Sequence, residues 1–119
     1  MSTSPLILAP SLLAGDHANL AASAAAVADA GLSWLHLDLM DGHFVPNITI
    51  GVPVVKSLRK VTRLPLDVHL MITNPDRYID DFAKAGAAMM SVHLEVVPHL
   101  HRTVHAIKDL GAKAGVVLN

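Results

Sequence analysis

Two tripeptides hold the residues of this chain that are best suited to chemistry. Residues 36–38 read His-Leu-Asp and residues 67–69 read Asp-Val-His, each within a short apolar run. Side chains alternate faces along a strand, so His36 and Asp38 should point the same way. Together with His69 from a neighbouring strand, they could hold one divalent metal ion. Such an ion could stabilise an enolate-type anion while Asp38 moves a proton, which indicates an enzyme.

The same residues also have a simpler interpretation. A histidine at the end of a strand is by default a polar residue that faces a loop. Three candidate ligands at equivalent ends of successive strands favour a metal site over that default. Asp67 is expected to face away from His69 and to be structural, and the pattern identifies no fourth ligand.

Three further residues stand where a substrate would meet such a site. Ser11 follows the first apolar run, where its hydroxyl could bind a substrate oxygen, although capping the loop is its default role. Met40 and Met71 come two residues after Asp38 and His69. They could form a water-excluding wall beside a reacting carbon, or they could fill gaps beneath a loop.

A second histidine pair lies near the end of the chain. His101 and His105 are four residues apart, so they share one face of a predicted helix, and such a pair can bind zinc. Arg102 and Lys108 flank the pair, and the helix should belong to an outer layer. We therefore expect a solvent-exposed face there and no metal site.

Strands and helices must alternate along the chain to position the candidate residues. Strands are expected over residues 6–9, 34–38, 66–70, 89–93 and 114–118. Helices are expected over residues 17–30 and 53–59, from a start within 73–76 to residue 85, and over 98–110. Asp16 is the expected N-cap of the first helix. Gly31, Gly86 and Gly111 should end three of the four helices.

This alternation predicts a parallel α/β sheet with right-handed crossovers. Two architectures fit it: an open, doubly wound sheet and part of an eight-stranded barrel. A complete barrel takes roughly 250 residues, about twice the length of this chain. A Gly-x-Gly-x-x-Gly motif, typical of dinucleotide-binding sheets, does not follow the first predicted strand.

Composition narrows the classes of partner. The net charge is -1 and only 3% of the 119 residues are aromatic, which argues against nucleic acid and against an anionic membrane surface. The chain contains no cysteine, which fits a reducing compartment. Its N-terminus carries no signal-like segment. We therefore expect one cytoplasmic domain over residues 1–119, with neither nucleic acid nor a membrane as a partner.

Three motifs resemble the ribulose-phosphate 3-epimerase family. They are residues 8–14 (LAPSLLA), 36–47 (HLDLMDGHFVPN) and 67–71 (DVHLM). The resemblance continues through residues 114–119 and so covers essentially the whole chain, with 36–47 as its most specific block. It implies a parallel (β/α)8 barrel of TIM type, of which this chain would hold about the first four βα units and strand five.

The resemblance also implies an activity. The family interconverts D-ribulose 5-phosphate and D-xylulose 5-phosphate, in the pentose phosphate pathway, by proton transfer through a cis-enediolate. The cofactor would be one divalent metal ion held by His36, Asp38 and His69. Zinc, iron(II), manganese and cobalt all suit nitrogen and oxygen ligands of this kind. Asp38 would also be one of two carboxylates that carry the proton.

The resemblance further assigns contacts with the pentulose 5-phosphate substrate. Ser11 and His69 would touch the substrate, while Met40 and Met71 would wall the reacting centre. The family's second acid/base aspartate, which is also its fourth metal ligand, and its glycine-rich phosphate-binding segments lie on later strands. We therefore expect this chain by itself to be inactive or nearly inactive, and to form a homo-oligomer.

Two other functions stay open at this point. One is a sister epimerase that acts on a hexulose 6-phosphate such as allulose 6-phosphate, since the metal half-site would be the same. The other is a non-catalytic half-barrel that assembles with itself or with a partner.

Overall fold

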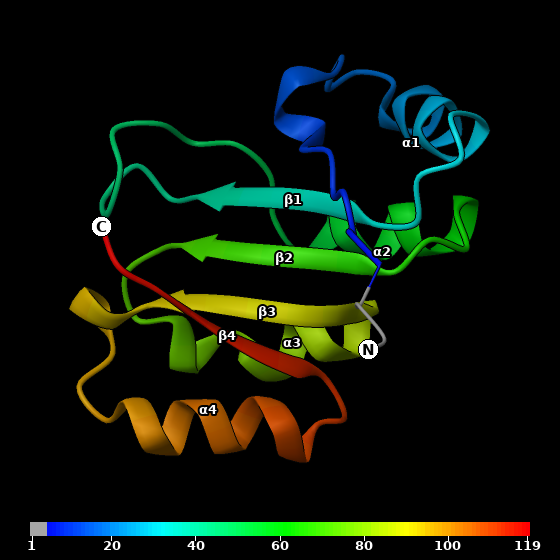
Figure 1. The fold of residues 1–119 in the computed structure, drawn as a ribbon. Helices are drawn as coiled ribbons and strands as arrows, with labels where there is room; N and C mark the ends of the chain where they lie inside the picture. Colours follow the sequence, from blue (N-terminus) through cyan, green and yellow to red (C-terminus); the bar gives the residue numbers. More distant parts are fainter. Residues whose placement is uncertain (1–4) are drawn as a thin grey trace.

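The computed structural model describes residues 5–119, and its strands form one parallel sheet in the order β1-β2-β3-β4 (Figure 1). The strands are β1 (Leu35–Met40), β2 (Leu66–Met71), β3 (Ala87–His93) and β4 (Lys113–Val117). The helices are α1 (Leu20–Asp29), α2 (Val52–Val61), α3 (Ile79–Ala85) and α4 (Leu100–Asp109). Short 3-10 turns occupy Leu12–Ala14, Pro75–Arg77 and Leu94–Val96.

The order of the strands decides between the two expected architectures. Each strand pairs with the next one along the chain, and the direction never reverses. Right-handed crossovers that always move the same way deliver their helices to one face of the sheet. A doubly wound sheet reverses direction and so carries helices on both faces. Helices α2 and α3 lie together behind the sheet (Figure 1), so the expected barrel-type winding is confirmed.

Alternation along each strand divides the sheet into two faces. Leu35, Leu37 and Leu39 of β1 are at most 1% exposed, and they contribute to the hydrophobic core with apolar residues of α2, α3 and α4. We call this side the helix face. His36 and Asp38 point to the other side and remain half-buried. We call that side the open face, and it carries the polar residues of the strands.

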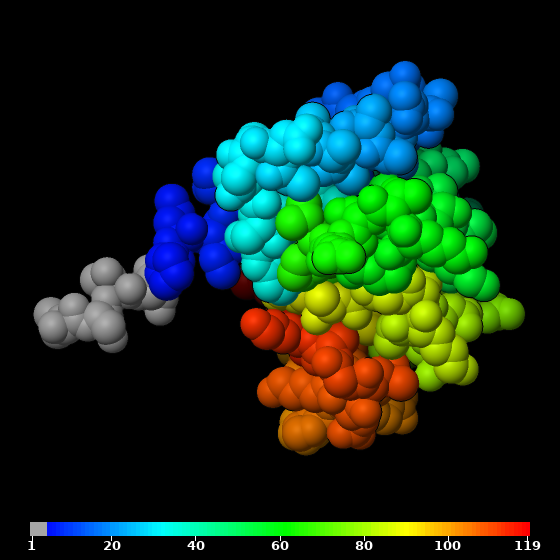
Figure 2. All heavy atoms as spheres, turned by 90° about the vertical axis from the view of Figure 1, so that its right-hand side faces the viewer, coloured from blue at the N-terminus to red at the C-terminus, as the bar shows by residue number. Residues whose placement is uncertain are grey.

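The predicted strand at residues 6–9 is absent, which corrects the expectation of five strands. One isolated bridge joins Ser11 to His36, and the His36 N–H donates to the Pro10 carbonyl over 2.9 Å. A strand forms only where a neighbour takes its backbone groups, and this contact begins after the apolar run. Leu6 is 87% exposed and Leu8 52% exposed, and these first described residues stand out from the body of the molecule (Figure 2).

Several element boundaries differ from their predicted positions. Helix α1 begins three residues later than expected, because Asn19 and not Asp16 caps it by accepting from the Ala22 N–H. Asp16 instead accepts from the Ala18 N–H in a turn before the helix. Residues 75–77 form a 3-10 turn, so α3 begins only at Ile79.

Other predicted features of the fold are confirmed. Gly31, Gly86 and Gly111 all have positive φ values where α1, α3 and α4 end. The fifth predicted strand is present as β4. None of the helices in the described part of the chain has the length and apolar character needed to cross a membrane.

Candidate metal centre

Strand register brings the candidate ligands together on the open face. Asp38 of β1 pairs with His69 of β2, and His36 pairs with Asp67 one step earlier. Because both strands are parallel, residues at equivalent positions near their carboxyl ends meet at the same edge of the sheet. The spacing of two along β1 and the pairing across to β2 therefore place three polar side chains at one point.

The three predicted ligands point their donor atoms at each other. His36 Nε2 and His69 Nδ1 each lie 3.1 Å from Asp38 Oδ1. One donor atom from each residue can be chosen so that all three lie within 4.8 Å of one another. The side chains are 24%, 18% and 12% exposed for His36, His69 and Asp38, so solvent or a small ligand can reach them. Two nitrogens and one carboxylate oxygen form a donor set suited to zinc, iron(II), manganese or cobalt.

Hydrogen bonds and burial set the charge of this cluster. The hydrogen bond that His36 donates to Asp67 is the largest influence on the pKa of His36 and raises it, although burial opposes the shift. Burial alone would raise the pKa of Asp38. The hydrogen bond from Ser11 and the two neighbouring imidazoles outweigh burial and lower that pKa. Asp38 is therefore ionised at neutral pH, the form that binds a cation or accepts a proton.

Two of the three candidate ligands are also held from behind by a second residue. Asp67 Oδ2 lies 2.9 Å from His36 Nδ1, the nitrogen that faces away from Asp38. The Ser11 hydroxyl donates to Asp38 Oδ2. Metal-binding histidines and carboxylates are usually oriented by such outer partners.

The expected orientation of Asp67 is wrong. Strand alternation puts residues 67 and 69 on the same face because they are two apart, and both are half-buried on the open face. Its Oδ2 bonds His36, while its Oδ1 is buried without a partner. Asp67 thus supports a candidate ligand, which is a structural role exerted inside the site.

One residue of the site escaped the sequence-based prediction. His93 ends β3, is 5% exposed, and its Nε2 lies 2.8 Å from His69 Nε2. The pKa of His93 is lowered, first by burial and then by the neighbouring His69. The rule used for the other residues, a polar side chain near the carboxyl end of a predicted strand, would have found it.

Ser11 fills its expected default role as the cap of a loop and also contacts Asp38, while its contact with substrate stays a prediction. Its Oγ accepts from the Leu13 N–H over 3.2 Å, which caps the 3-10 turn, and its hydroxyl reaches Asp38. Met40 and Met71 are paired in register at the ends of β1 and β2. They therefore lie one step beyond Asp38 and His69 on the open face.

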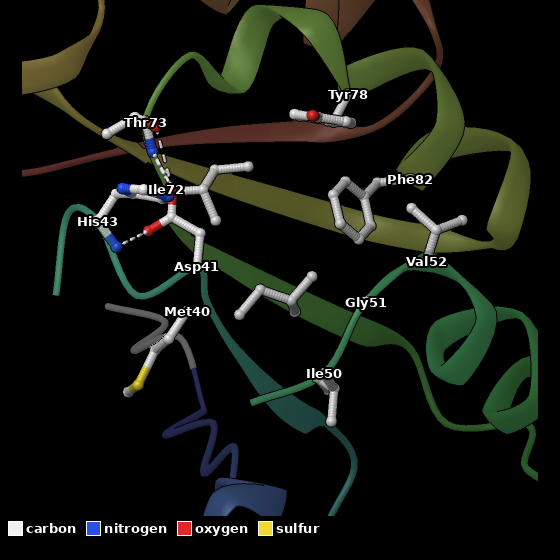
Figure 3. Close-up of a pocket in the computed structure, with 11 residues that line it drawn as sticks. Met40, Asp41, His43, Ile50, Gly51, Val52, Ile72, Thr73, Tyr78 and Phe82 are labelled. Atoms are coloured by element: carbon white, nitrogen blue, oxygen red, sulfur yellow. Dashed lines mark hydrogen bonds between the residues drawn. The ribbon is translucent and has the colours of Figure 1, made fainter. Parts of the chain in front are cut away.

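A groove of about 460 Å³ lies next to the loops after β1 and β2 (Figure 3), and none of the three candidate ligands lines it. Tyr78 and Phe82 line one side of it, and the loop after β1 lines another. In that loop Asp41 accepts from the backbone N–H groups of His43, Phe44 and Thr73. These bonds outweigh burial and lower its pKa from 3.8 to about 2. Asp41 thus ties the loop after β1 to the loop after β2.

The second histidine pair lies away from this site. His101 and His105 are exposed on α4, as expected, with ring centroids 4.3 Å apart. They belong to the outer helical layer and have no part in the cluster on the open face.

The chain matches known proteins over nearly its full length. The model of the ribulose-phosphate 3 epimerase family matches residues 7–119. The chain is 60% identical over 112 residues to ribulose-phosphate 3-epimerase of Bacillus subtilis (strain 168), covering 94% of the chain and 52% of that protein. It is 53% identical over 116 residues to the enzyme of that name from Synechocystis sp. (strain ATCC 27184 / PCC 6803 / Kazusa), covering 96% and 50%.

A plant relative gives the same result. The chain is 58% identical over 120 residues to the chloroplastic ribulose-5-phosphate-3-epimerase of Arabidopsis thaliana, covering 99% of the chain and 43% of that protein. The chain therefore spans about half the length of the curated relatives that it matches.

Proposed function

The chain belongs to the ribulose-phosphate 3-epimerase family, and from this premise we propose that it supplies the metal-binding part of an epimerase active site. The reaction is the interconversion of D-ribulose 5-phosphate and D-xylulose 5-phosphate. The observation that carries the proposal is the convergence of His36 Nε2, Asp38 Oδ1 and His69 Nδ1 on the open face.

The residues present fit a divalent cation. Their two nitrogens and one oxygen suit zinc and its neighbours, and three protein ligands leave coordination positions for a substrate. The partners behind His36 and Asp38 are of the kind that orient metal ligands. A bound cation supplies positive charge that stabilises the cis-enediolate formed when a proton leaves the carbon beside a ketone.

Asp38 is the proposed proton carrier. It is ionised, it faces the open side of the sheet, and Ser11 fixes its Oδ2. Ser11 and His69 are also proposed to contact the substrate. Met40 and Met71 would line the reacting carbon with apolar surface, which keeps water from returning the proton at random.

Inversion of a carbon centre needs a proton carrier on each face of the substrate. Among residues 5–119, the other carboxylates near the cluster are engaged elsewhere. Asp67 bonds His36, Asp41 bonds Thr73, and Glu95 accepts from the Asn119 N–H. We therefore propose that this chain alone removes and returns a proton on one face, with little net epimerisation.

We also propose that residues 1–119 act as one domain, the N-terminal portion of a ribulose-phosphate-binding barrel, and that copies of it associate. Leu6, Leu8 and Leu118 are 87%, 52% and 71% exposed, which is unusual for residues of this size. Sedimentation of the purified chain tests the second statement, and a monomer at all concentrations would contradict it.

The decisive experiment follows proton exchange on the substrate. The chain is incubated with D-ribulose 5-phosphate and Zn²⁺ in D2O, and the C3 hydrogen is followed by proton NMR. We expect zinc-dependent loss of this signal, and a drop of about 10²- to 10⁴-fold in Asp38→Asn. Asp109→Asn, an exposed carboxylate on α4, is the matched control and should behave as the unmodified chain.

Equal exchange by Asp38→Asn and the unmodified chain would refute the proposed role of Asp38. Product chromatography with allulose 6-phosphate as a second substrate tests the choice of sugar. A faster reaction with the hexulose phosphate would replace the pentulose in this proposal.

A further inference from the structure

His93 holds an unusual position behind the candidate metal site. Its ring stacks on His69 with centroids 4.9 Å apart and an interplanar angle of 21°, and the Phe44 ring lies 4.6 Å away. The Nε2 atoms of the two histidines face each other at 2.8 Å. The other nitrogen of His93, Nδ1, is buried without a hydrogen-bond partner and lies 3.8 Å from Glu95 Oε2.

The 2.8 Å contact restricts where the protons can be. With both rings neutral, each imidazole carries one proton, and a hydrogen bond between two nitrogens needs one proton between them. Either His93 donates and His69 carries its proton at Nδ1, or His69 donates from Nε2 and His93 carries its proton at Nδ1. The first arrangement gives His69 Nδ1 a hydrogen bond to Asp38 Oδ1 over 3.1 Å.

Only the second arrangement is compatible with metal binding. A histidine nitrogen that binds a cation must present a lone pair, so His69 Nδ1 must be bare. The proton of His69 then sits on Nε2 and needs an acceptor, which is His93 Nε2. The proton of His93 is displaced to Nδ1, the buried atom that faces the carboxylate of Glu95.

We propose that His93 is a positioning residue that selects the metal-binding tautomer of His69, with Glu95 stabilising the far end of the pair. This inference rests on the proposed metal site. It assigns the same kind of outer partner to the third ligand that Asp67 and Ser11 provide for the other two.

Two variants separate hydrogen bonding from packing. His93→Phe keeps a flat ring beside Phe44 but offers no acceptor, so His69 should shift its proton to Nδ1, where the proton competes with the cation. His93→Gln places an amide oxygen near the position of Nε2 and should restore acceptance. We expect zinc affinity to fall about 10- to 100-fold in His93→Phe and to recover in His93→Gln.

The measurements use the unmodified chain and both variants, with far-UV circular dichroism to match their folds. Zinc affinity comes from competition with a chelator, in protein that carries His101→Ala and His105→Ala to remove the exposed pair. Long-range ¹⁵N–¹H NMR spectra of the zinc-bound protein then show which nitrogen of each histidine carries a proton. The expected pattern is Nε2–H for His69 and Nδ1–H for His93.

The outcomes are distinct. If the unmodified chain binds no zinc, the proposed function fails and this inference fails with it. The metal site stands and only the role of His93 is refuted in two cases. In the first, zinc binds but His69 is protonated at Nδ1. In the second, both His93 variants bind zinc as tightly as the unmodified chain.

Discussion

Alternate residues of β1 meet two different environments. Leu35, Leu37 and Leu39 are at most 1% exposed on the helix face, whereas His36 and Asp38 keep 24% and 12% of their side chains exposed on the open face. The helix face is stabilised by buried apolar area, which any side chain of similar volume and shape provides. The open face depends on particular atom pairs at about 3 Å. Within one strand, stability and candidate function thus depend on alternate residues.

The strongest test of this comparison substitutes neighbours on opposite faces. Leu37→Ala leaves a cavity beneath the helices and should lower the free energy of unfolding by about 2–5 kcal/mol. His36→Ala should cost about 1 kcal/mol or less, because it removes partly exposed hydrogen bonds. Urea unfolding followed by circular dichroism measures both variants. Equal losses of unfolding free energy would show that the two faces contribute equally to stability, which would contradict this comparison.

A second test acts on function without touching the core. Asp67→Ala removes the acceptor behind His36 and should weaken zinc binding about 10- to 100-fold, with a smaller loss in Asp67→Asn. The unfolding midpoint should change far less than in Leu37→Ala. Calorimetric zinc titration is the measurement. An unchanged zinc affinity in Asp67→Ala would show that Asp67 does not support metal binding.

A third and smaller effect comes from Asp41, in the loop after β1. Asp41 has its pKa lowered from 3.8 to about 2 in the folded chain, so its contribution is present above pH 4 and is lost as pH falls towards 2. Solvent screening limits that contribution to about 1 kcal/mol. The unmodified chain should therefore exceed Asp41→Asn in stability at pH 6, and the gap should shrink between pH 4 and pH 2. A gap that stays constant with pH would contradict this account.

Local rules predicted most elements of the fold. The glycines that end α1, α3 and α4 and the apolar runs of the strands depend on neighbouring residues in the chain, so they are visible in the sequence. The predicted strand over residues 6–9 was wrong because a strand needs a partner, and in this region only Ser11 forms a bridge with β1. The predicted start of α1 was wrong because Asp16 and Asn19 are both good caps, and it is Asn19 that accepts from the first turn of the helix.

The candidate site shows the same division. His36, Asp38 and His69 could be grouped because a spacing of two and equivalent strand ends are properties of the sequence. His93 was missed although it also ends a predicted strand, where the same rule would have identified it, but its contact with His69 depends on the pairing of β2 with β3. The role of Asp67 was misjudged by an error in alternation, and its contact with His36 depends on the pairing of β1 with β2.

The sequence by itself therefore determined the family, the residue types and the alternation that sends leucines to one side of each strand and ligands to the other. Only the tertiary structure decided which atoms meet: Asp38 between two imidazoles, Asp67 behind His36, and His93 behind His69. The physical reason is one of range. Backbone geometry fixes directions within a few residues, whereas hydrogen bonds at 3 Å depend on the register between strands that lie more than twenty residues apart.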